Sequence, residues 1–154
     1  HRGFQTLPHI DIFANPSNKI TQLKSIIFDK LDEYYLKYSD EKCSYIRKWP
    51  TEKYISGWHV ILKRHGSQNR HIHPEGWLSG VVYLQVCEPM GKNEGAIEFS
   101  LNGNNYSERE SPKLIYSPKV GDIILFPSSL HHKTIPFTSD MDRIIISFDL
   151  LPKN

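Results

Sequence analysis

The chain has 154 residues, of which 38% are apolar and 23% charged, so it is long enough for one domain with a sizeable core and too short for two. A net charge of +2 is too small to indicate a nucleic-acid partner, and no apolar run approaches the roughly 20 residues that span a membrane. The two cysteines, Cys43 and Cys87, lie far apart and do not form a disulfide framework, which favours a reducing, cytoplasmic setting. Because the first residue is His1 rather than Met, it stays open whether the chain is a fragment of a larger protein.

The N-terminal part of the chain is expected to contain a single long helix. Residues 1–17 carry two prolines and little periodicity, so we expect an extended lead-in. From Asn18, a residue type that favours helix N-caps, apolar residues recur at three- and four-residue spacing. This pattern predicts an amphipathic helix over residues 18–40, which would cover one face of a sheet.

The remainder, residues 50–154, has the pattern of short strands separated by turns. Trp58, Val60 and Leu62 alternate with polar residues, as in a strand with one buried face. Turn-forming residues gather at 91–95 and 102–105. The predicted strands cover residues 58–62, 78–86, 96–101, 113–116, 123–126 and 143–150. One helix followed by many short strands indicates an all-β core with a covering helix, arranged as a sandwich or jelly roll.

Three histidines form a candidate metal site. His71 and His73 are two residues apart, so in a strand both side chains would project from the same face and converge on one ion. The pair His131–His132 lies about sixty residues downstream, just past the predicted strand 123–126, and one of its two rings would supply the third histidine. Imidazole suits iron, zinc, copper and nickel alike, so the histidines alone do not select the metal.

Arg143 suggests the chemistry of that site. It begins the last predicted strand, which can run back alongside the one carrying His132 and place the guanidinium in the same cavity. A buried arginine needs an anionic partner, and its planar fork fits a carboxylate. A metal beside a carboxylate clamp is what a 2-oxo acid co-substrate requires. The alternative is a surface ion pair of Arg143 with Asp140 or Asp142.

Four segments of the chain resemble a known family. Residues 71–84, 118–137 and 143–152, with the opening at 2–6, are similar to 2-oxoglutarate/iron(II) oxygenases, which often stand at the C-terminal end of tetratricopeptide-repeat proteins. The resemblance implies a double-stranded β-helix (jelly roll) within a single domain, residues 1–154. It also implies iron(II) and 2-oxoglutarate as cofactors, with oxidation of a small-molecule or peptide substrate and release of succinate and carbon dioxide.

The resemblance also implies roles for individual residues. His71 and His132 would bind the metal and Arg143 would clamp 2-oxoglutarate, while His131 falls in a variable slot of the motif. His73 stands where the wider superfamily has a carboxylate ligand, so the third ligand stays open between His73, Glu75 and a water molecule.

The resemblance is imperfect beside the clamp. Ile145 stands where many relatives have a hydroxyl residue, so Tyr83 or Ser147 would have to supply the hydrogen bond to the co-substrate.

Two other interpretations remain. Gly121, Pro127 and His132 follow the second motif of cupins, which would make the chain a metal enzyme or small-ligand binder without need of Arg143. The first cupin motif requires a glutamate shortly after His73, and the chain has Trp77 and Leu78 there. The other interpretation is a catalytically silent jelly roll that serves as a binding domain.

Overall fold

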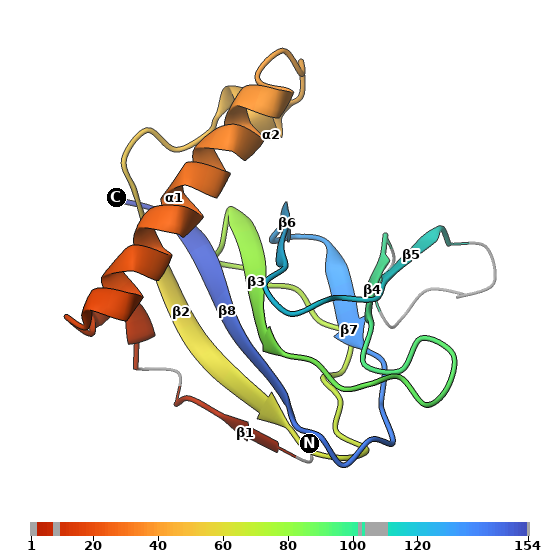
Figure 1. The fold of residues 1–154 in the computed structure, drawn as a ribbon. Coiled ribbons are helices and arrows are strands. Elements are labelled where there is room, and N and C mark those ends of the chain that lie inside the picture. The colour runs from red at the N-terminus through yellow and green to blue at the C-terminus, as the bar shows by residue number, and fades with distance from the viewer. Residues whose placement is uncertain (1–2, 8–9, 102, 104–110, 154) are drawn as a thin grey trace.

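Two β-sheets face each other, and one long helix packs on the outer side of the larger sheet (Figure 1). The computed structural model describes residues 3–7, 10–101, 103 and 111–153. Arg2 of the opening segment and most of the predicted turn at 102–105 therefore lie outside the described residues. The elements in chain order are β1 (Gly3–Gln5), η1 (Ile12–Ala14), α1 (Asn18–Tyr38), α2 (Ser44–Arg47), β2 (Lys53–Leu62), β3 (Leu78–Gln85), β4 (Ile97–Ser100), β5 (Lys113–Tyr116), β6 (Ile123–Pro127), β7 (His131–Thr134) and β8 (Arg143–Pro152).

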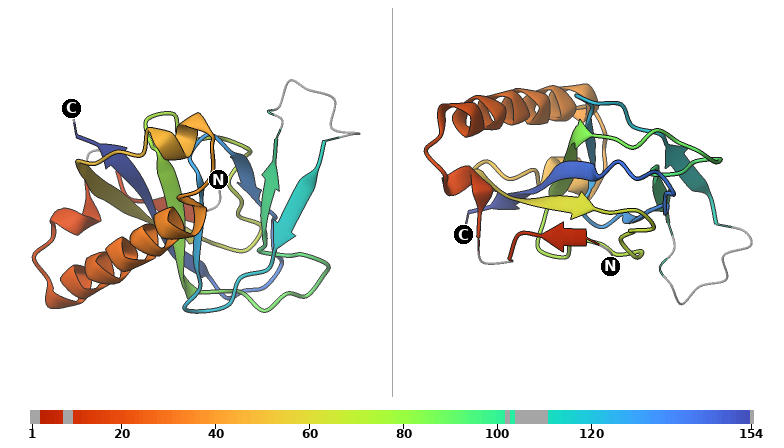
Figure 2. Two further views of the ribbon diagram at one scale, coloured as in Figure 1. Left: turned by 90° about the horizontal axis from the view of Figure 1, so that it is seen from above. Right: turned by 60° about the horizontal axis from the view of Figure 1, so that its bottom comes forward.

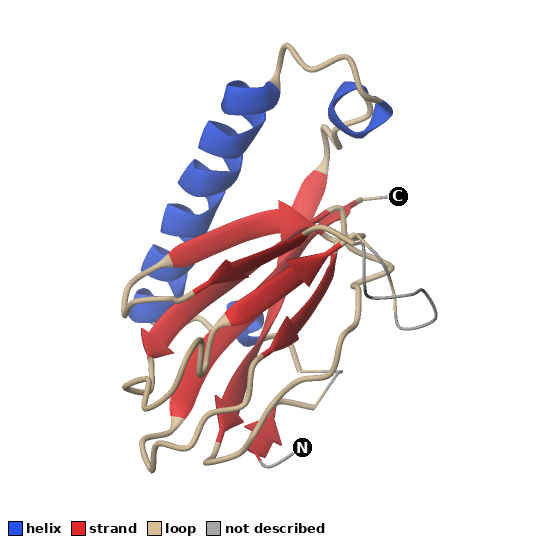
Figure 3. Ribbon diagram, turned by 90° about the vertical axis from the view of Figure 1, so that its right-hand side faces the viewer, coloured by secondary structure: helices blue, strands red, loops and turns tan. Residues whose placement is uncertain are grey.

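The strand order is that of a jelly roll. The larger sheet runs β1-β2-β8-β3-β6 and the smaller one β5-β4-β7, and every pairing between these strands is antiparallel. Figures 2 and 3 show the two sheets as separate layers, with α1 lying across the larger one only. The predicted fold class, an all-β core with a covering helix, is therefore confirmed.

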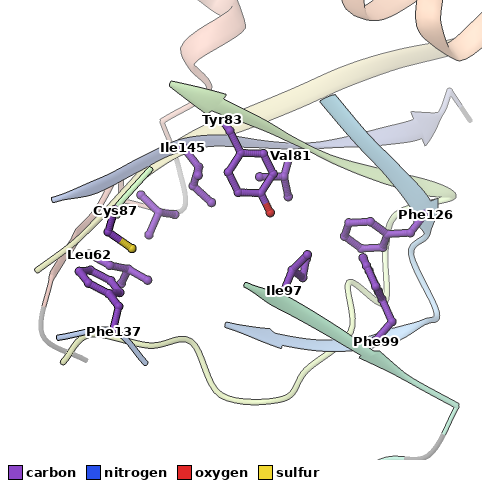
Figure 4. Close-up of a cluster of buried hydrophobic side chains, with 10 residues drawn as sticks. Leu62, Val81, Tyr83, Cys87, Ile97, Phe99, Phe126, Phe137 and Ile145 are labelled. Carbon is purple, nitrogen blue, oxygen red and sulfur yellow. The ribbon is translucent and has the colours of Figure 1, made fainter. Parts of the chain in front are cut away.

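The central strand β8 contributes to two separate cores because its side chains alternate between the faces of the sheet. Ile146, Phe148 and Leu150 point toward the helix, where they pack with Ile27 and Leu31 of α1. The intervening residues point between the two sheets. There, Ile145 joins a second cluster with side chains of β2, β3, β4 and β6 (Figure 4). The interior between the sheets is only partly apolar, because β8 also directs Arg143, Ser147 and Asp149 into it.

Several boundaries differ from the prediction. The N-cap of α1 is Ser17 rather than Asn18, and the helix ends two residues earlier than predicted, at Tyr38. The lead-in contains the short strand β1 and the turn η1, because Gln5 and its neighbours pair with the edge of β2. Strand β7 and the single-turn helix α2 were not predicted. β7 has the sequence His-His-Lys-Thr, without the apolar residues of the equally short β4 and β5, and α2 is too short to repeat a helical spacing.

On the side of the larger sheet that faces the helix, a glycine backbone and an aromatic ring are in close contact. Gly80 of β3 lies against the ring of Phe148 on β8, and a Cβ atom at that position would come within 2.1 Å of the ring.

Among the described residues, neither helix is long and apolar enough to cross a membrane. Cys43 and Cys87 are both free.

Candidate metal centre and co-substrate cavity

The three predicted histidines meet at one point between the sheets. His71 forms an isolated antiparallel bridge with His132 of β7, with N–H to carbonyl distances of 3.0 and 3.1 Å in the two directions. This bridge places the two rings side by side, and His73 follows two residues later. The Nε2 atoms of His71 and His73 are 3.3 Å apart, and one ligand atom from each of the three histidines lies within 4.8 Å of the others. The group has the size and donor type of a metal site.

The rings of His71 and His132 are each held by a backbone carbonyl that accepts a hydrogen bond from Nδ1. The Nδ1 atom of His71 donates to the Asn69 carbonyl at 2.6 Å, and that of His132 donates to the Leu130 carbonyl at 3.0 Å. A carbonyl oxygen can only accept, so Nδ1 carries the proton in both rings and the Nε2 lone pair stays free. Such contacts to the far nitrogen orient metal-binding histidines in general.

His73 is held differently, by a carboxylate. Its Nδ1 atom lies 2.6 Å from Oδ1 of Asp149 on β8, and the same oxygen accepts from the Ser79 hydroxyl at 2.6 Å. Ser79 in turn lies 2.8 Å from the buried hydroxyl of Ser128. The three Nε2 atoms are therefore the nitrogens left to bind a metal, each on an oriented ring.

Burial keeps two of the rings neutral. Loss of solvent lowers the pKa of His132 from its ordinary value to about 4, and burial likewise lowers the pKa of His71. A neutral imidazole is the form that binds metal, so both rings are in the metal-binding state at neutral pH.

Arg143 is the largest fully buried side chain among the described residues, at 1% exposure. Its Nη2 atom donates to the Tyr83 hydroxyl at the long distance of 3.5 Å, and its guanidinium carbon lies 5.1 Å from the centre of the Tyr83 ring. Its Nε and Nη1 atoms have no hydrogen-bond partner in the part of the chain that the structure describes. A buried cation with unpaired donors favours an anionic ligand.

A cavity of about 370 Å³ connects the histidines with Arg143. All three histidines line it, and so do Trp58 and Arg143. The other lining residues are Gln5, Gln68, Asn69, Arg70, Val81, Ile97, Thr134, Ile145 and Ser147. The volume is of the order expected for a small-ligand site. Of the two arginines that line the cavity, Arg70 pairs with Glu98 at 2.9 Å, whereas Arg143 has the unpaired donors.

Two geometric expectations were wrong, although the residues still meet. The segment with His71 and His73 is not a regular strand, because only His71 forms a bridge and the chain then turns. Strand β8 does not run beside β7: it pairs with β2 and β3 in the larger sheet, while His132 lies in the smaller one. Arg143 and His132 therefore line the same cavity from opposite sheets.

The surface alternative for Arg143 was also wrong. Asp140 pairs with Arg64 and Asp142 pairs with Lys63, whereas Arg143 is buried.

The remaining predicted residues lie as follows. Ser147 lines the cavity from β8, and Tyr83 contacts Arg143 from the neighbouring strand β3. Glu75 is exposed on the turn after His73 and is not among the residues whose ligand atoms converge. His131 faces the other side of β7, where a Cβ atom on Gly103 would come within 2.9 Å of its ring.

Sequence reasoning missed Asp149 and Ser79. The signal was present, because Arg143, Ser147 and Asp149 are separated by even numbers of residues and therefore share one face of β8. What the sequence could not show is that Ser79 of β3 stands directly opposite Asp149 in the sheet.

Comparisons with known proteins point to one family. The model of a family described as "Putative 2OG-Fe(II) oxygenase" matches residues 56–149, which is more than half of the chain and includes the three histidines and Arg143. A comparison with curated protein sequences gave no match.

Solved structures of low sequence identity share the fold. HygX from Streptomyces hygroscopicus with iron bound has a TM-score of 0.60 at 14% identity, over 99% of this chain and 73% of that one. A viral collagen prolyl hydroxylase from Paramecium Bursaria Chlorella virus-1, in a 2OG complex, has a TM-score of 0.60 at 15% identity, over 99% and 81%. An oxidoreductase of the 2OG-Fe(II) oxygenase family from Burkholderia pseudomallei has a TM-score of 0.52 at 13% identity and covers 71% of this chain. The present chain spans 49% of the length of that last protein.

Proposed function

This chain belongs to the 2OG-Fe(II) oxygenase family, and on that basis we propose that His71, His73 and His132 bind iron(II) and that Arg143 binds the distal carboxylate of 2-oxoglutarate. The reaction would be a hydroxylase-type oxidation of a small-molecule or peptide substrate, with release of succinate and carbon dioxide. Tyr83 and Ser147 would support the co-substrate.

The unpaired guanidinium of Arg143 carries the proposal. A fully buried arginine whose Nε and Nη1 atoms have no partner in the described chain is costly unless a ligand completes its hydrogen bonds. A dicarboxylic 2-oxo acid has the two ends that this cavity requires: a chelating end for the metal and a carboxylate for the arginine. A cupin-type site has no need of a buried cation with unpaired donors in the same cavity as three converging histidines.

Each residue of the site would have a separate role in binding the metal or the co-substrate. Bound iron(II) with 2-oxoglutarate would supply the oxidising chemistry. The three imidazoles would hold the metal through Nε2, with orientations set by the acceptors at Nδ1. Arg143 would fix the far end of the co-substrate, and the Tyr83 hydroxyl beside it would add a hydrogen bond. Trp58 and Ile145 would line the space between, excluding water from the reacting groups.

Anaerobic titration with iron(II) and 2-oxoglutarate tests this function. The expected result is a weak visible charge-transfer band in the wild type, which the Arg143→Ala variant forms only at far higher 2-oxoglutarate concentration. A metal that binds without any band, equally in both proteins, would favour a cupin-type site. Absence of metal binding would favour a silent binding domain.

Three broader features are also part of the proposal. We propose that residues 1–154 form one domain, that the protein acts in the cytoplasm, and that a tetratricopeptide-repeat domain flanks it in a longer chain. Two free cysteines are in accord with a reducing compartment. The mass and subcellular fraction of the native protein, detected with an antibody against this domain, would test all three.

A further inference from the structure

We propose that Asp149 is a positioning residue of the metal centre. Its carboxylate would hold His73 in the tautomer that binds metal through Nε2, and would supply behind that ring the negative charge that no direct ligand provides. This inference rests on the proposed function, since it takes His73 to be a metal ligand.

The first argument is the geometry of the contact. Asp149 on β8 stands opposite Ser79 on β3 in the register of the larger sheet, and both side chains point between the sheets. One oxygen of Asp149 lies 2.6 Å from Nδ1 of His73 and 2.6 Å from the Ser79 hydroxyl. Distances this short are typical of hydrogen bonds to an ionised acceptor. The His73 and Asp149 side chains are only 12% and 13% exposed, so water competes little with this contact.

The second argument comes from counting protons. The Ser79 hydroxyl has one proton, which it donates to Asp149, so the buried Ser128 hydroxyl must donate to Ser79 across their 2.8 Å contact. Ser128 therefore donates to Ser79, and Ser79 donates to Oδ1 of Asp149. Because Oδ1 of Asp149 accepts, Nδ1 of His73 carries the proton of their contact, and the Ser79 hydroxyl lies 3.0 Å from the same nitrogen. In the neutral ring Nε2 then keeps its lone pair.

The third argument is that three separate parts of the chain fix the carboxylate. The turn after His73 folds back over it: a Cβ atom on Gly76 would come within 3.2 Å of Cγ of Asp149 and 2.5 Å of the Ser128 hydroxyl. The same turn is anchored by the His73 N–H, which donates to the Ser128 carbonyl at 2.9 Å. Asp149 therefore contacts Ser79 of β3 and His73 at the start of the turn directly, and Ser128 of the segment after β6 holds both of these partners in place.

The fourth argument is the asymmetry of the three histidines. The rings of His71 and His132 donate to neutral backbone carbonyls, and His73 alone donates to a carboxylate. The carboxylate behind His73 makes this imidazole a stronger donor to metal than the other two, because a charged acceptor holds its Nδ1 proton.

Metal titration of three variants tests this role. Cobalt(II) and iron(II) affinities are measured anaerobically on Asp149→Asn, on Ser79→Ala and on the control Asp140→Asn, which removes an exposed carboxylate paired with Arg64. We expect about 10–100-fold weaker metal binding for Asp149→Asn, as is usual when a contact behind a ligand is lost, and a smaller loss for Ser79→Ala. The control should bind within twofold of wild type.

Two further readouts separate positioning from other roles. The visible spectrum of the cobalt(II) form should change in Asp149→Asn, because the His73 ring is no longer held in place. The unfolding midpoint of the metal-free protein should change little. A loss of stability with unchanged affinity and spectrum would reduce Asp149 to a structural residue and overturn the inference. A loss of metal binding as complete as in His73→Ala would make Asp149 a direct ligand and overturn it equally.

Failure of this inference differs from failure of the proposed function. If the wild type forms its iron and 2-oxoglutarate complex while Asp149→Asn binds metal within twofold of it, the positioning role is wrong and the function stands. If the wild type binds neither metal, both are wrong.

Discussion

Replacing Arg143 by methionine should stabilise the ligand-free protein while abolishing its response to 2-oxoglutarate. The guanidinium is 1% exposed, and two of its nitrogens have no partner in the described part of the chain. Burial also lowers the pKa of this group from its ordinary value, because desolvation disfavours the charged form. The folded state without ligand therefore carries an uncompensated cost that an unbranched apolar side chain of similar length would not carry.

The magnitude follows from the unpaired groups. Exchanging buried ionic groups for apolar residues of similar volume often stabilises a protein by about 1–4 kcal/mol. Because Arg143 retains one long contact to Tyr83 and the ring face beneath it, we expect about 1–3 kcal/mol here. For a chain of this size that corresponds to an increase of roughly 2–12 °C in the unfolding midpoint.

Urea unfolding followed by tryptophan fluorescence measures this effect. Metal-free wild type and Arg143→Met are compared first, and then both with anaerobic iron(II) and 2-oxoglutarate. At a ligand concentration of 100 times Kd the wild type should gain about 2.7 kcal/mol, and the variant should gain none from the co-substrate. Arg64→Met is the matched control, since that arginine is half exposed and pairs only at the surface with Asp140. A ligand-free Arg143→Met protein that is less stable than the wild type would refute the idea that the cation is uncompensated.

Three other predictions concern the site and the packing around it. His132→Ala should weaken iron(II) binding at least tenfold and His131→Ala should leave it within twofold, by anaerobic titration; the reverse order would show that the wrong histidine has been assigned. Leu31→Ala should lower the free energy of unfolding by about 2–5 kcal/mol, because this fully buried side chain joins α1 to the larger sheet, and a change below 1 kcal/mol would mean that the helix is loosely packed. Gly80→Ala should lower the free energy of unfolding by about 1–3 kcal/mol, because the added methyl group clashes with the Phe148 ring. Adding Phe148→Leu to the same chain should restore part of that free energy. If it restores none, the strain does not come from this contact.

Prediction from sequence succeeded where the spacing of apolar residues along the chain is typical of one kind of secondary structure. The helix was recognised because its apolar residues follow helical spacing over five turns, and its span differed from the structure only at the C-terminal end. Strand β5 was predicted with its observed bounds, and β8 with its observed start. Strand β7 was missed because it has no apolar side chain, and its strand character comes from pairing with β4 and not from its own pattern.

For the site, the sequence predicted which residues come together, but not how they are arranged. His71, His73, His132 and Arg143 were singled out from the sequence because histidine pairs and an isolated arginine near a strand start are chemically unusual. The reasoning about how they meet was partly wrong, because a strand can reach a cavity from the opposite sheet as well as from a neighbouring position. Spacing along a chain does not distinguish these two arrangements.

The sequence by itself therefore determined the fold class, the family and the residue types that can hold a metal and an anion, because these depend on local periodicity and on motifs a few residues long. The tertiary structure alone decided which atoms face one another. It placed Arg143 across the cavity from His132 and not beside it, left two of its nitrogens unpaired among the described residues, and brought Asp149 behind His73. The physical reason is that hydrogen bonds and burial at this site join residues up to 76 positions apart in the chain, and only strand pairing sets their distances.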